Sequence, residues 1–126
     1  MEFRDNQAVY LQIVDYVCEQ ILLRNWKTEE KISSIRDLAI ALQVTPNTVQ
    51  RSYDFIQQMD IISNQRGIGF FVEKDAIEKI LKYKKAEFVS RDLPVFFKTL
   101  RLLKMDMEEI ELLFNRYQKS AQKNKI

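Results

Sequence analysis

The chain has 126 residues, of which 46% are apolar and 30% charged, enough for one globular domain or a small domain with an appendage. It contains no histidine and a single cysteine, Cys18, which excludes His-based catalysis, an intrachain disulfide and Cys- or His-rich metal sites. Two glycines and two prolines favour long helices over a fold with many turns, and the net charge of +2 is too small to indicate a partner.

The first helical segment is indicated by apolar residues spaced three and four positions apart. In a helix this spacing gathers the side chains on one face, so we expect that face to pack against a core. The helix is expected to end near Asn25 and Trp26. The stripe consists of Tyr10, Ile13, Val14, Val17 and Ile21.

Two short helices are predicted next, over residues 35–42 and 46–58. Ser34 precedes the first one as a natural N-cap, because its hydroxyl can accept a hydrogen bond from an otherwise unpaired N–H group. Thr45 and Pro46 indicate the start of the second, where the fixed φ of proline suits the first helical position. The apolar face of the second helix is formed by Val49, Tyr53 and Ile56.

Both glycines of the chain, Gly67 and Gly69, lie in one stretch between two short β-rich segments. The spacing predicts a small hairpin, in which the connection from Asn64 to Phe70 is too short to turn without a residue at positive φ. A hairpin directly after two short helices can supply a wing beside them.

The C-terminal part carries further apolar helical stripes, which predict either a core or a dimer interface. Pro94 is expected to interrupt or to kink the first of these helices, because its ring would clash with the carbonyl group of Ser90. Asp106 is the expected N-cap of the last helix. The stripes are Ile77, Ile80, Leu81 and Phe88, then Phe96, Phe97, Leu100 and Leu103, then Met107, Ile110, Leu113, Phe114 and Tyr117.

The two short helices with their tight turn are the minimum of a helix-turn-helix. The face of the second helix opposite its apolar stripe carries Asn47, Gln50, Arg51 and Asp54, at positions i, i+3, i+4 and i+7. Asparagine and glutamine can pair with adenine, and arginine with guanine. In this motif the residues near the N-terminus of the second helix reach the base edges. The sequence therefore predicts a DNA-reading face.

The runs Lys31–Ala39, Leu42–Tyr53 and Arg66–Val72 resemble, in order and spacing, the DNA-binding domain of the GntR family of bacterial transcription regulators. The Pro46–Arg51 segment and the short remainder of the chain resemble the YtrA-like branch, which carries a two-helix C-terminal extension. The chain departs from the family pattern at Pro46 and Gln50, where many members have arginine. It departs again at Asp60, where a glycine commonly ends the recognition helix.

The resemblance implies a mainly α protein: a winged helix-turn-helix with a small β-hairpin wing (residues 1–72), followed by a two- to three-helix dimerisation appendage (residues 73–126). It implies a non-enzymatic repressor that binds a palindromic operator on double-stranded DNA as a homodimer. The single thiol, with no disulfide framework, fits the cytoplasm. No cofactor, metal, catalytic residue or membrane contact is expected, and the sequence identifies no small-molecule effector. The predicted DNA-binding residues are Ser34, Arg36, Thr45, Asn47, Thr48, Gln50, Arg51, Arg66, Gly67 and Gly69.

The distribution of charge leaves a second interpretation open. Residues 1–72 carry seven basic and nine acidic side chains, a net charge of −2, whereas residues 73–126 carry thirteen basic and nine acidic side chains, a net charge of +4. A DNA-binding domain is expected to present a basic face. The alternative is a winged-helix module that binds another protein instead of DNA.

Overall fold

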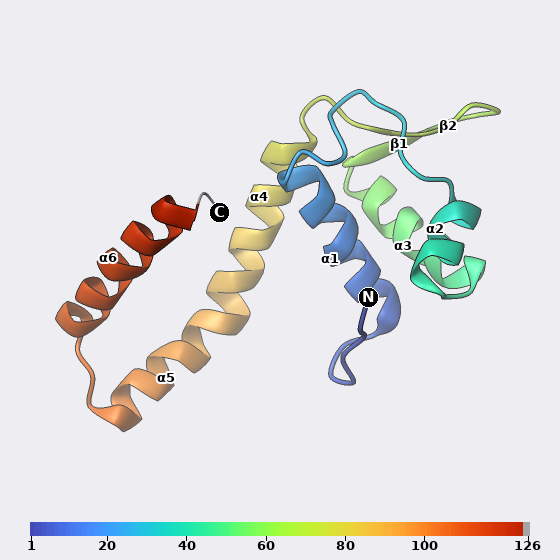
Figure 1. Cartoon of the computed structure of the whole chain (residues 1–126). Helices are drawn as coiled ribbons and strands as arrows, with labels where there is room; N and C mark the ends of the chain where they lie inside the picture. The colour runs from blue at the N-terminus through green and yellow to red at the C-terminus, as the bar shows by residue number, and fades with distance from the viewer. Residues whose placement is uncertain (125–126) are drawn as a thin grey trace. The chain divides into compact units, whose positions relative to one another are not determined.

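The structure of the chain, a computed structural model, describes residues 1–124 (Figure 1). The fold is mainly helical with one small hairpin, and the chain divides into two compact units, Met1–Lys84 and a second that begins at Lys85. The elements in order are α1 (Val9–Leu22), α2 (Ile35–Leu42), α3 (Pro46–Gln58), β1 (Ile62–Gln65), β2 (Gly69–Val72), α4 (Ala76–Glu87), the π-helix η1 (Phe88–Asp92), α5 (Leu93–Leu103) and α6 (Met107–Asn124).

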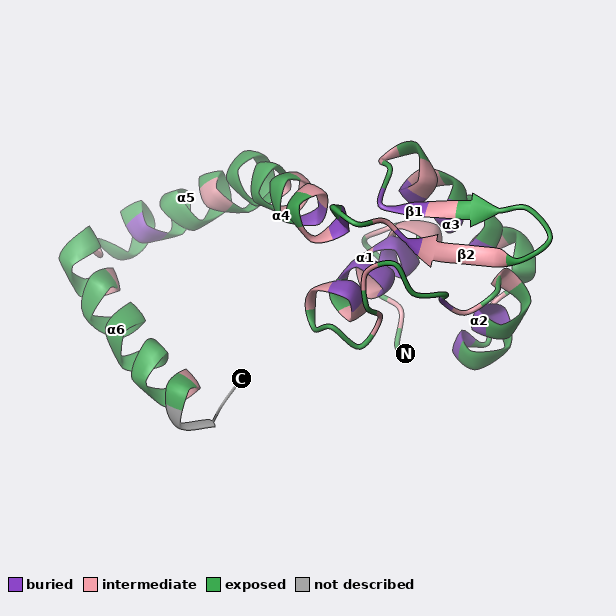
Figure 2. Ribbon diagram, turned by 90° about the horizontal axis from the view of Figure 1, so that it is seen from above, coloured by how far each residue is buried: buried purple, intermediate pink, exposed green. Residues whose placement is uncertain are grey.

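The first unit is built around one apolar core to which α1, α2 and α3 each contribute a face. Ile13 and Val17 of α1 and Val49 and Ile56 of α3 are completely buried, and Leu38 of α2 is nearly so. These are positions that the helical spacing predicts to face inward. Figure 2 shows the buried residues concentrated on the inner sides of these helices.

The starts of α2 and α3 confirm the predicted caps. The Ser34 hydroxyl accepts a hydrogen bond from the backbone N–H of Asp37 at 3.0 Å, and the Thr45 hydroxyl accepts one from Thr48 at 3.4 Å. Pro46 occupies the first turn of α3, where its missing N–H interrupts no helical bond. Because both helices begin at capped residues, their relative start points, and hence the turn between them, are fixed by local sequence.

Tyr53 links α3 to the chain segment before α2. Its side chain is completely buried, and its hydroxyl donates a hydrogen bond to the carbonyl oxygen of Ser33 at 2.7 Å. Burial raises the pKa of the Tyr53 phenol well above its usual value of 10, and the nearby Tyr16 adds a smaller contribution in the same direction. Tyr53 is therefore a neutral donor throughout the physiological pH range.

The hairpin has the predicted glycine geometry. β1 and β2 pair antiparallel with Ile62 opposite Val72, and the N–H of Ile68 closes the turn on the carbonyl of Gln65 at 2.9 Å. Gly67 has φ +77° and Gly69 has φ +142°, backbone regions that favour glycine. Lys31 forms an isolated bridge with Phe71, so the segment before α2 borders the hairpin.

The end of α3 also follows the sequence. Asp60, which stands where many family members have glycine, takes up φ +58°, a left-handed conformation that aspartate tolerates better than most residues. The next residues, Ile61 and Ile62, are buried and lead the chain into β1.

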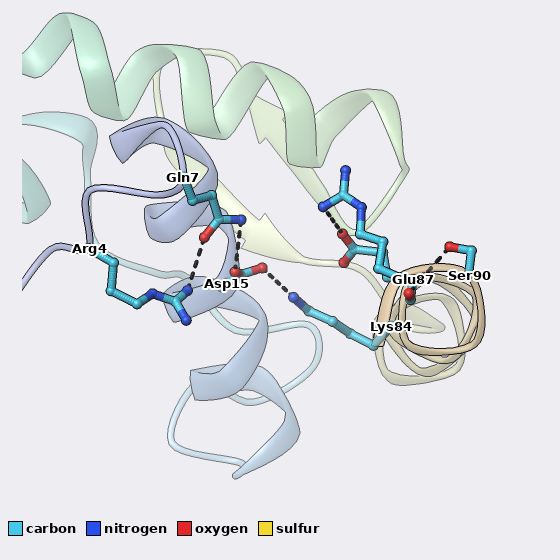
Figure 3. A network of polar contacts seen from close by, with 7 residues as sticks. Arg4, Gln7, Asp15, Lys84, Glu87 and Ser90 are labelled. Atoms are coloured by element: carbon cyan, nitrogen blue, oxygen red, sulfur yellow. Dashed lines mark hydrogen bonds and ion pairs between the residues drawn. The ribbon is translucent and has the colours of Figure 1, made fainter. Parts of the chain in front are cut away.

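The compact part of the first unit continues past residue 72 into α4. Ala76 and Ile80 are completely buried in the same core as α1 and α3. Lys84, near the end of α4, forms an ion pair with Asp15 of α1, which in turn accepts a hydrogen bond from Gln7 at 3.5 Å (Figure 3). The first half of α4 thus belongs structurally to the winged domain, while the functional division at residues 72 and 73 stays a prediction.

Pro94 lies in the first turn of α5, directly after the π-helix η1. The N–H of Leu93 bonds to the carbonyl of Phe88, five residues back, which is the wider spacing of a π-turn. The helix runs from α4 through η1 into α5 without a break, and the π-turn directly before Pro94 accommodates the proline within it. Along the expected stripe of α4, Ile80 is buried, but Leu81 and, in η1, Phe88 are exposed.

The second unit contains hardly any core. Among the residues after Lys84 whose burial is described, Leu100 is the one buried apolar residue, at 8% exposure. Asp106 caps α6 as predicted, because its carboxylate accepts a hydrogen bond from the N–H of Glu109 at 2.9 Å. The helices are therefore well defined locally, but their apolar faces are largely uncovered.

Candidate nucleic-acid interface

The exposed face of α3 is the centre of the candidate site. Asn47, Gln50, Arg51 and Asp54 are all exposed, because they lie opposite the buried stripe that holds α3 on the core. The positive end of the helix dipole lies at the same end as Asn47, which favours a nearby anion. The face therefore combines donors, acceptors and one guanidinium group within about two helical turns.

Gln50 and Asp54 are not independent of one another. The Gln50 amide nitrogen donates a hydrogen bond to the Asp54 carboxylate at 2.9 Å, an i,i+4 contact along α3. This bond fixes which way the amide points. The amide keeps its oxygen and one N–H free, which are the two groups that glutamine uses to pair with adenine.

Arg51 lies against the first turns of α1. Its guanidinium carbon is 3.8 Å from the centre of the Tyr10 ring, a close cation–π stack. A shallow recess of ≈ 340 Å³ opens beside this pair. Its lining combines the start of α1 with the start of α3 and consists of Ala8, Val9, Tyr10, Asn47, Thr48 and Arg51.

The predicted residues around the helix starts have their polar groups near the surface. Ser34 and Thr45 are exposed, and each uses its side-chain oxygen as a cap. The hydroxyl groups of Thr45 and Thr48 are 2.9 Å apart. Arg36 is exposed in the first turn of α2. These groups lie at helix N-termini, where backbone amides and hydroxyls commonly meet phosphate.

The wing supplies the remaining predicted residues. Arg66 and Gly67 are exposed at the turn, and Gly69 is half-buried at the start of β2. A Cβ atom built on Gly69 would lie 2.7 Å from Cε of Lys31, so the Lys31 side chain runs directly past this glycine. Lys31 thus adds a cation to the wing that we did not predict as a site residue.

Tyr10, like Lys31, is a residue of the candidate site that was not predicted from the sequence. Its helical spacing indicated a core position, yet its ring is only half-buried and stacks on Arg51. Tyr10 and Arg51 are 41 positions apart, so no local pattern connects them. The one signal in the sequence was a tyrosine rather than an aliphatic residue at the most N-terminal position of the stripe.

Two of the acidic residues that weigh against DNA binding are turned away from the site. Successive residues of an α-helix are about 100° apart, so Asp15 and Glu19 lie about 140° and 180° around α1 from Tyr10. Asp15 is moreover paired with Lys84 (Figure 3). Asp15 and Glu19 therefore place no negative charge beside Arg51, whereas Asp54 lies on the same face of α3 as Arg51.

We predict that Gly69→Val folds but binds duplex DNA more weakly than the wild type. A β-branched residue resists the φ of +142°, at a cost of about 1–3 kcal/mol, and its side chain would displace Lys31 from the wing. Residues 63–69 contribute no side chain to the apolar core, so the cooperative melting transition should survive. Thermal melting and duplex titration would be measured side by side.

The matched control is Ile68→Val, which places the same side chain one position earlier, at an exposed residue without positive φ. It should leave both melting and affinity unchanged. Wild-type affinity in a folded Gly69→Val protein would mean that the wing does not contact DNA.

No helix among the described residues is long and apolar enough to cross a membrane. The same residues contain no cluster of three or more cysteine or carboxylate side chains placed to hold a metal ion. The geometry is that of a winged helix-turn-helix with α3 as the recognition helix.

Comparison with known proteins supports this class of protein. No family model matches the chain. The chain is 29% identical over 109 residues to the HTH-type transcriptional regulator YhcF of Bacillus subtilis, a match that covers 86% of this chain and 88% of YhcF. It is 32% identical over 73 residues to the HTH-type transcriptional repressor YtrA of Bacillus subtilis, covering 58% of this chain and 56% of YtrA.

Solved structures agree over nearly the whole length. A GntR-family regulator from Bacteroides thetaiotaomicron is 37% identical, with a TM-score of 0.77 over 90% of this chain and 98% of its own. BusR of S. agalactiae, solved with its promoter DNA, shares the fold at 18% identity and a TM-score of 0.60, over 92% of this chain and 58% of its own. The chain belongs to the GntR family of transcriptional regulators.

Proposed function

We propose that the protein binds a palindromic operator sequence-specifically as a homodimer and represses transcription by occupying it. The observation that carries this proposal is the face of α3, where Asn47, Gln50 and Arg51 are exposed side by side on a helix whose start is capped and fixed. Such a regulator acts through binding rather than catalysis, in the cytoplasm. The repressor role is supported by the similarity to the repressor YtrA, which covers 56% of that protein.

Within this proposal the residues take two kinds of role. Asn47, Gln50 and Arg51 read base edges in the major groove, because they lie on the first two turns of the recognition helix. The remaining predicted residues hold the sugar–phosphate backbone or the neighbouring groove. They are Ser34, Arg36, Thr45, Thr48, Arg66, Gly67 and Gly69.

The homodimer is supported by the second unit, whose apolar side chains have almost no cover within one chain. Twelve large apolar residues between Phe88 and Tyr117 are exposed, against one buried residue, Leu100. Helices of this length are marginal in water unless an apolar face is packed, and a contiguous exposed apolar surface marks an interaction site. A second copy of the same unit, with the same uncovered faces, is the occupant that we propose.

The spacing along α6 fits a helix–helix contact. Met107, Ile110, Phe114, Tyr117 and Ala121 follow one another at intervals of three, four, three and four residues. This alternation is that of a helix packed along another helix. Phe114 is in the middle of the stripe and is 54% exposed in the single chain. We therefore place the centre of the proposed interface at Phe114.

The alternative, a winged-helix module that binds another protein, is favoured only by the net charge of −2 over residues 1–72. Part of that charge does not lie near the recognition helix, because the acidic residues of α1, Asp15 and Glu19, face away from it. Asp54 is the exception, since it lies on the recognition face itself, but it accepts the Gln50 hydrogen bond there. DNA binding remains the function that the geometry supports best.

Two substitutions separate base reading from phosphate contact. Gln50→Ala is expected to cost about 1–3 kcal/mol on the cognate duplex and almost nothing on unrelated duplexes. Arg36→Ala is expected to weaken binding to all duplexes alike and to reduce the slope of log affinity against log salt by about one. Titrations of both variants against cognate and scrambled duplexes, at several salt concentrations, measure the two effects.

Asp54→Asn tests the effect of the negative charge on the same face. It removes the charge, while the new amide oxygen can still accept the hydrogen bond from Gln50. It should raise affinity for all duplexes. If Gln50→Ala and Arg36→Ala both lowered affinity uniformly across sequences, the assignment of roles would be wrong. Salt-independent binding of a protein ligand, without duplex binding, would establish the alternative.

A further inference from the structure

The guanidinium group of Arg51 is stacked on an aromatic ring from a different helix. The distance from its central carbon to the centre of the Tyr10 ring is 3.8 Å. The attraction between a guanidinium and the face of an aromatic ring takes up none of the polar acceptors that its N–H groups can bind. The stack therefore restrains the side chain while its hydrogen-bonding edge stays available.

The Tyr10 ring is itself held in place. It packs edge-on against Phe55 of α3, with ring centres 6.5 Å apart, and Phe55 packs edge-on against Tyr83 of α4 at 6.2 Å. The backbone of Tyr10 is anchored as well, because its carbonyl oxygen accepts a hydrogen bond from the buried Ser52 hydroxyl at 2.8 Å. Ser52 directly follows Arg51 in α3. Tyr10 and this part of α3 are therefore linked twice, through the Ser52–Tyr10 hydrogen bond between α3 and α1 and through the contact of the Arg51 side chain with the Tyr10 ring.

We propose that Tyr10 is a positioning residue for sequence recognition, which holds the Arg51 guanidinium in the orientation that pairs with a guanine edge. The inference rests on the proposed function and deepens it. A free arginine side chain has many rotamers, and ordering it on DNA costs conformational entropy. A ring that restrains the arginine before binding reduces that cost. Tyr10 thereby contributes to specificity without touching a base.

The experiment is a double-mutant cycle between Tyr10→Leu and Arg51→Ala, with titration against the cognate duplex and a duplex whose contacted guanine is replaced. Tyr10→Leu should lower cognate affinity between about 2-fold and 30-fold, the range of a cation–π contact. It should have almost no effect on the substituted duplex or in the Arg51→Ala background. The salt slope should not change, because the arginine charge is retained.

Tyr10→Phe keeps the ring and should bind like the wild type. Tyr16→Leu is the matched control, since Tyr16 is on the same helix but its ring contacts Trp26, whereas the Arg51 guanidinium lies over Tyr10. It should change melting without changing the preference for the cognate duplex. Melting of every variant is recorded, so that a loss of folded protein is not counted as a loss of affinity.

Three results would overturn the inference. An equal effect of Tyr10→Leu in the wild-type and Arg51→Ala backgrounds would mean that Tyr10 acts on DNA or on the fold directly. Unchanged or higher cognate affinity would mean that Arg51 leaves the ring in order to bind. A loss in Tyr10→Phe equal to that in Tyr10→Leu would assign the effect to the hydroxyl.

A DNA-independent readout separates failure of this inference from failure of the proposed function. In the free protein the Tyr10 ring current should shift the Arg51 side-chain protons upfield in the NMR spectrum, and Tyr10→Leu should abolish the shift. Absence of the shift would refute the positioning role on its own. Presence of the shift in a protein without any duplex preference would refute the base-reading role of Arg51, and the inference with it.

Discussion

Tyr53→Ala is expected to remove a large part of the free energy of unfolding of the winged domain. Removing a large, fully buried aromatic side chain costs about 3–5 kcal/mol, because the apolar surface is lost and a cavity remains. The ring also packs edge-on against Phe70 with centres 4.8 Å apart, and its hydroxyl satisfies the Ser33 carbonyl. A domain of this size has only about 5–10 kcal/mol of stability in total, so one such loss is a large share of it.

The measurement is chemical denaturation followed by far-UV circular dichroism. Tyr53→Phe is the matched variant: it keeps the packing and loses one hydrogen bond, so it should cost about 1 kcal/mol. Asp54→Ala, at the exposed neighbouring position, should change stability by less than about 0.5 kcal/mol. A Tyr53→Ala protein that unfolded within about 1 kcal/mol of the wild type would contradict the assignment of Tyr53 to the centre of the core.

Phe114→Glu is expected to convert the protein into a monomer and to reduce affinity for a full palindromic site by about 10²- to 10⁴-fold. The substitution places a charge in the middle of the α6 stripe, where it would have to be buried against the second copy without a partner. Each winged domain should still fold, because Phe114 belongs to the second unit. Affinity for an isolated half-site should therefore stay close to the wild-type value.

Sedimentation equilibrium at micromolar concentration gives the oligomeric state, and titrations with full and half sites give the affinities. The control is Asn115→Asp, which makes the same change in charge one residue further along, about 100° around the helix. It should remain dimeric and bind normally. A wild-type protein that sediments as a clean monomer, or a Phe114→Glu protein that binds the full site normally, would contradict the dimer proposal.

The helix-turn-helix could be predicted closely because its signals are local. Ser34, Thr45 and Pro46 fix the starts of α2 and α3 through bonds to residues no more than three positions away. The left-handed turns at Asp60 and Gly67 likewise follow from what single residues tolerate. The solvent-facing residues of α3 could be predicted as well, because they lie opposite the apolar residues that face the core.

What could not be predicted depends on contacts between distant segments. The Tyr10–Arg51 stack joins α1 to α3, and the approach of Lys31 to Gly69 joins the segment before α2 to the wing. Neither contact produces a periodic pattern of residue types from which it could be predicted. The π-turn before Pro94 is a further example, because the proline predicts a disturbance but several backbone solutions relieve the same clash.

Binding of a palindromic operator by a homodimer is tested by a footprint of the purified protein on the DNA upstream of its own gene, with a scrambled duplex as competitor. We expect protection of two half-sites related by two-fold symmetry, which is lost in Phe114→Glu and shifted in sequence preference by Gln50→Ala. Binding that tracks only salt and total charge, with no protected palindrome at any upstream position, would contradict it.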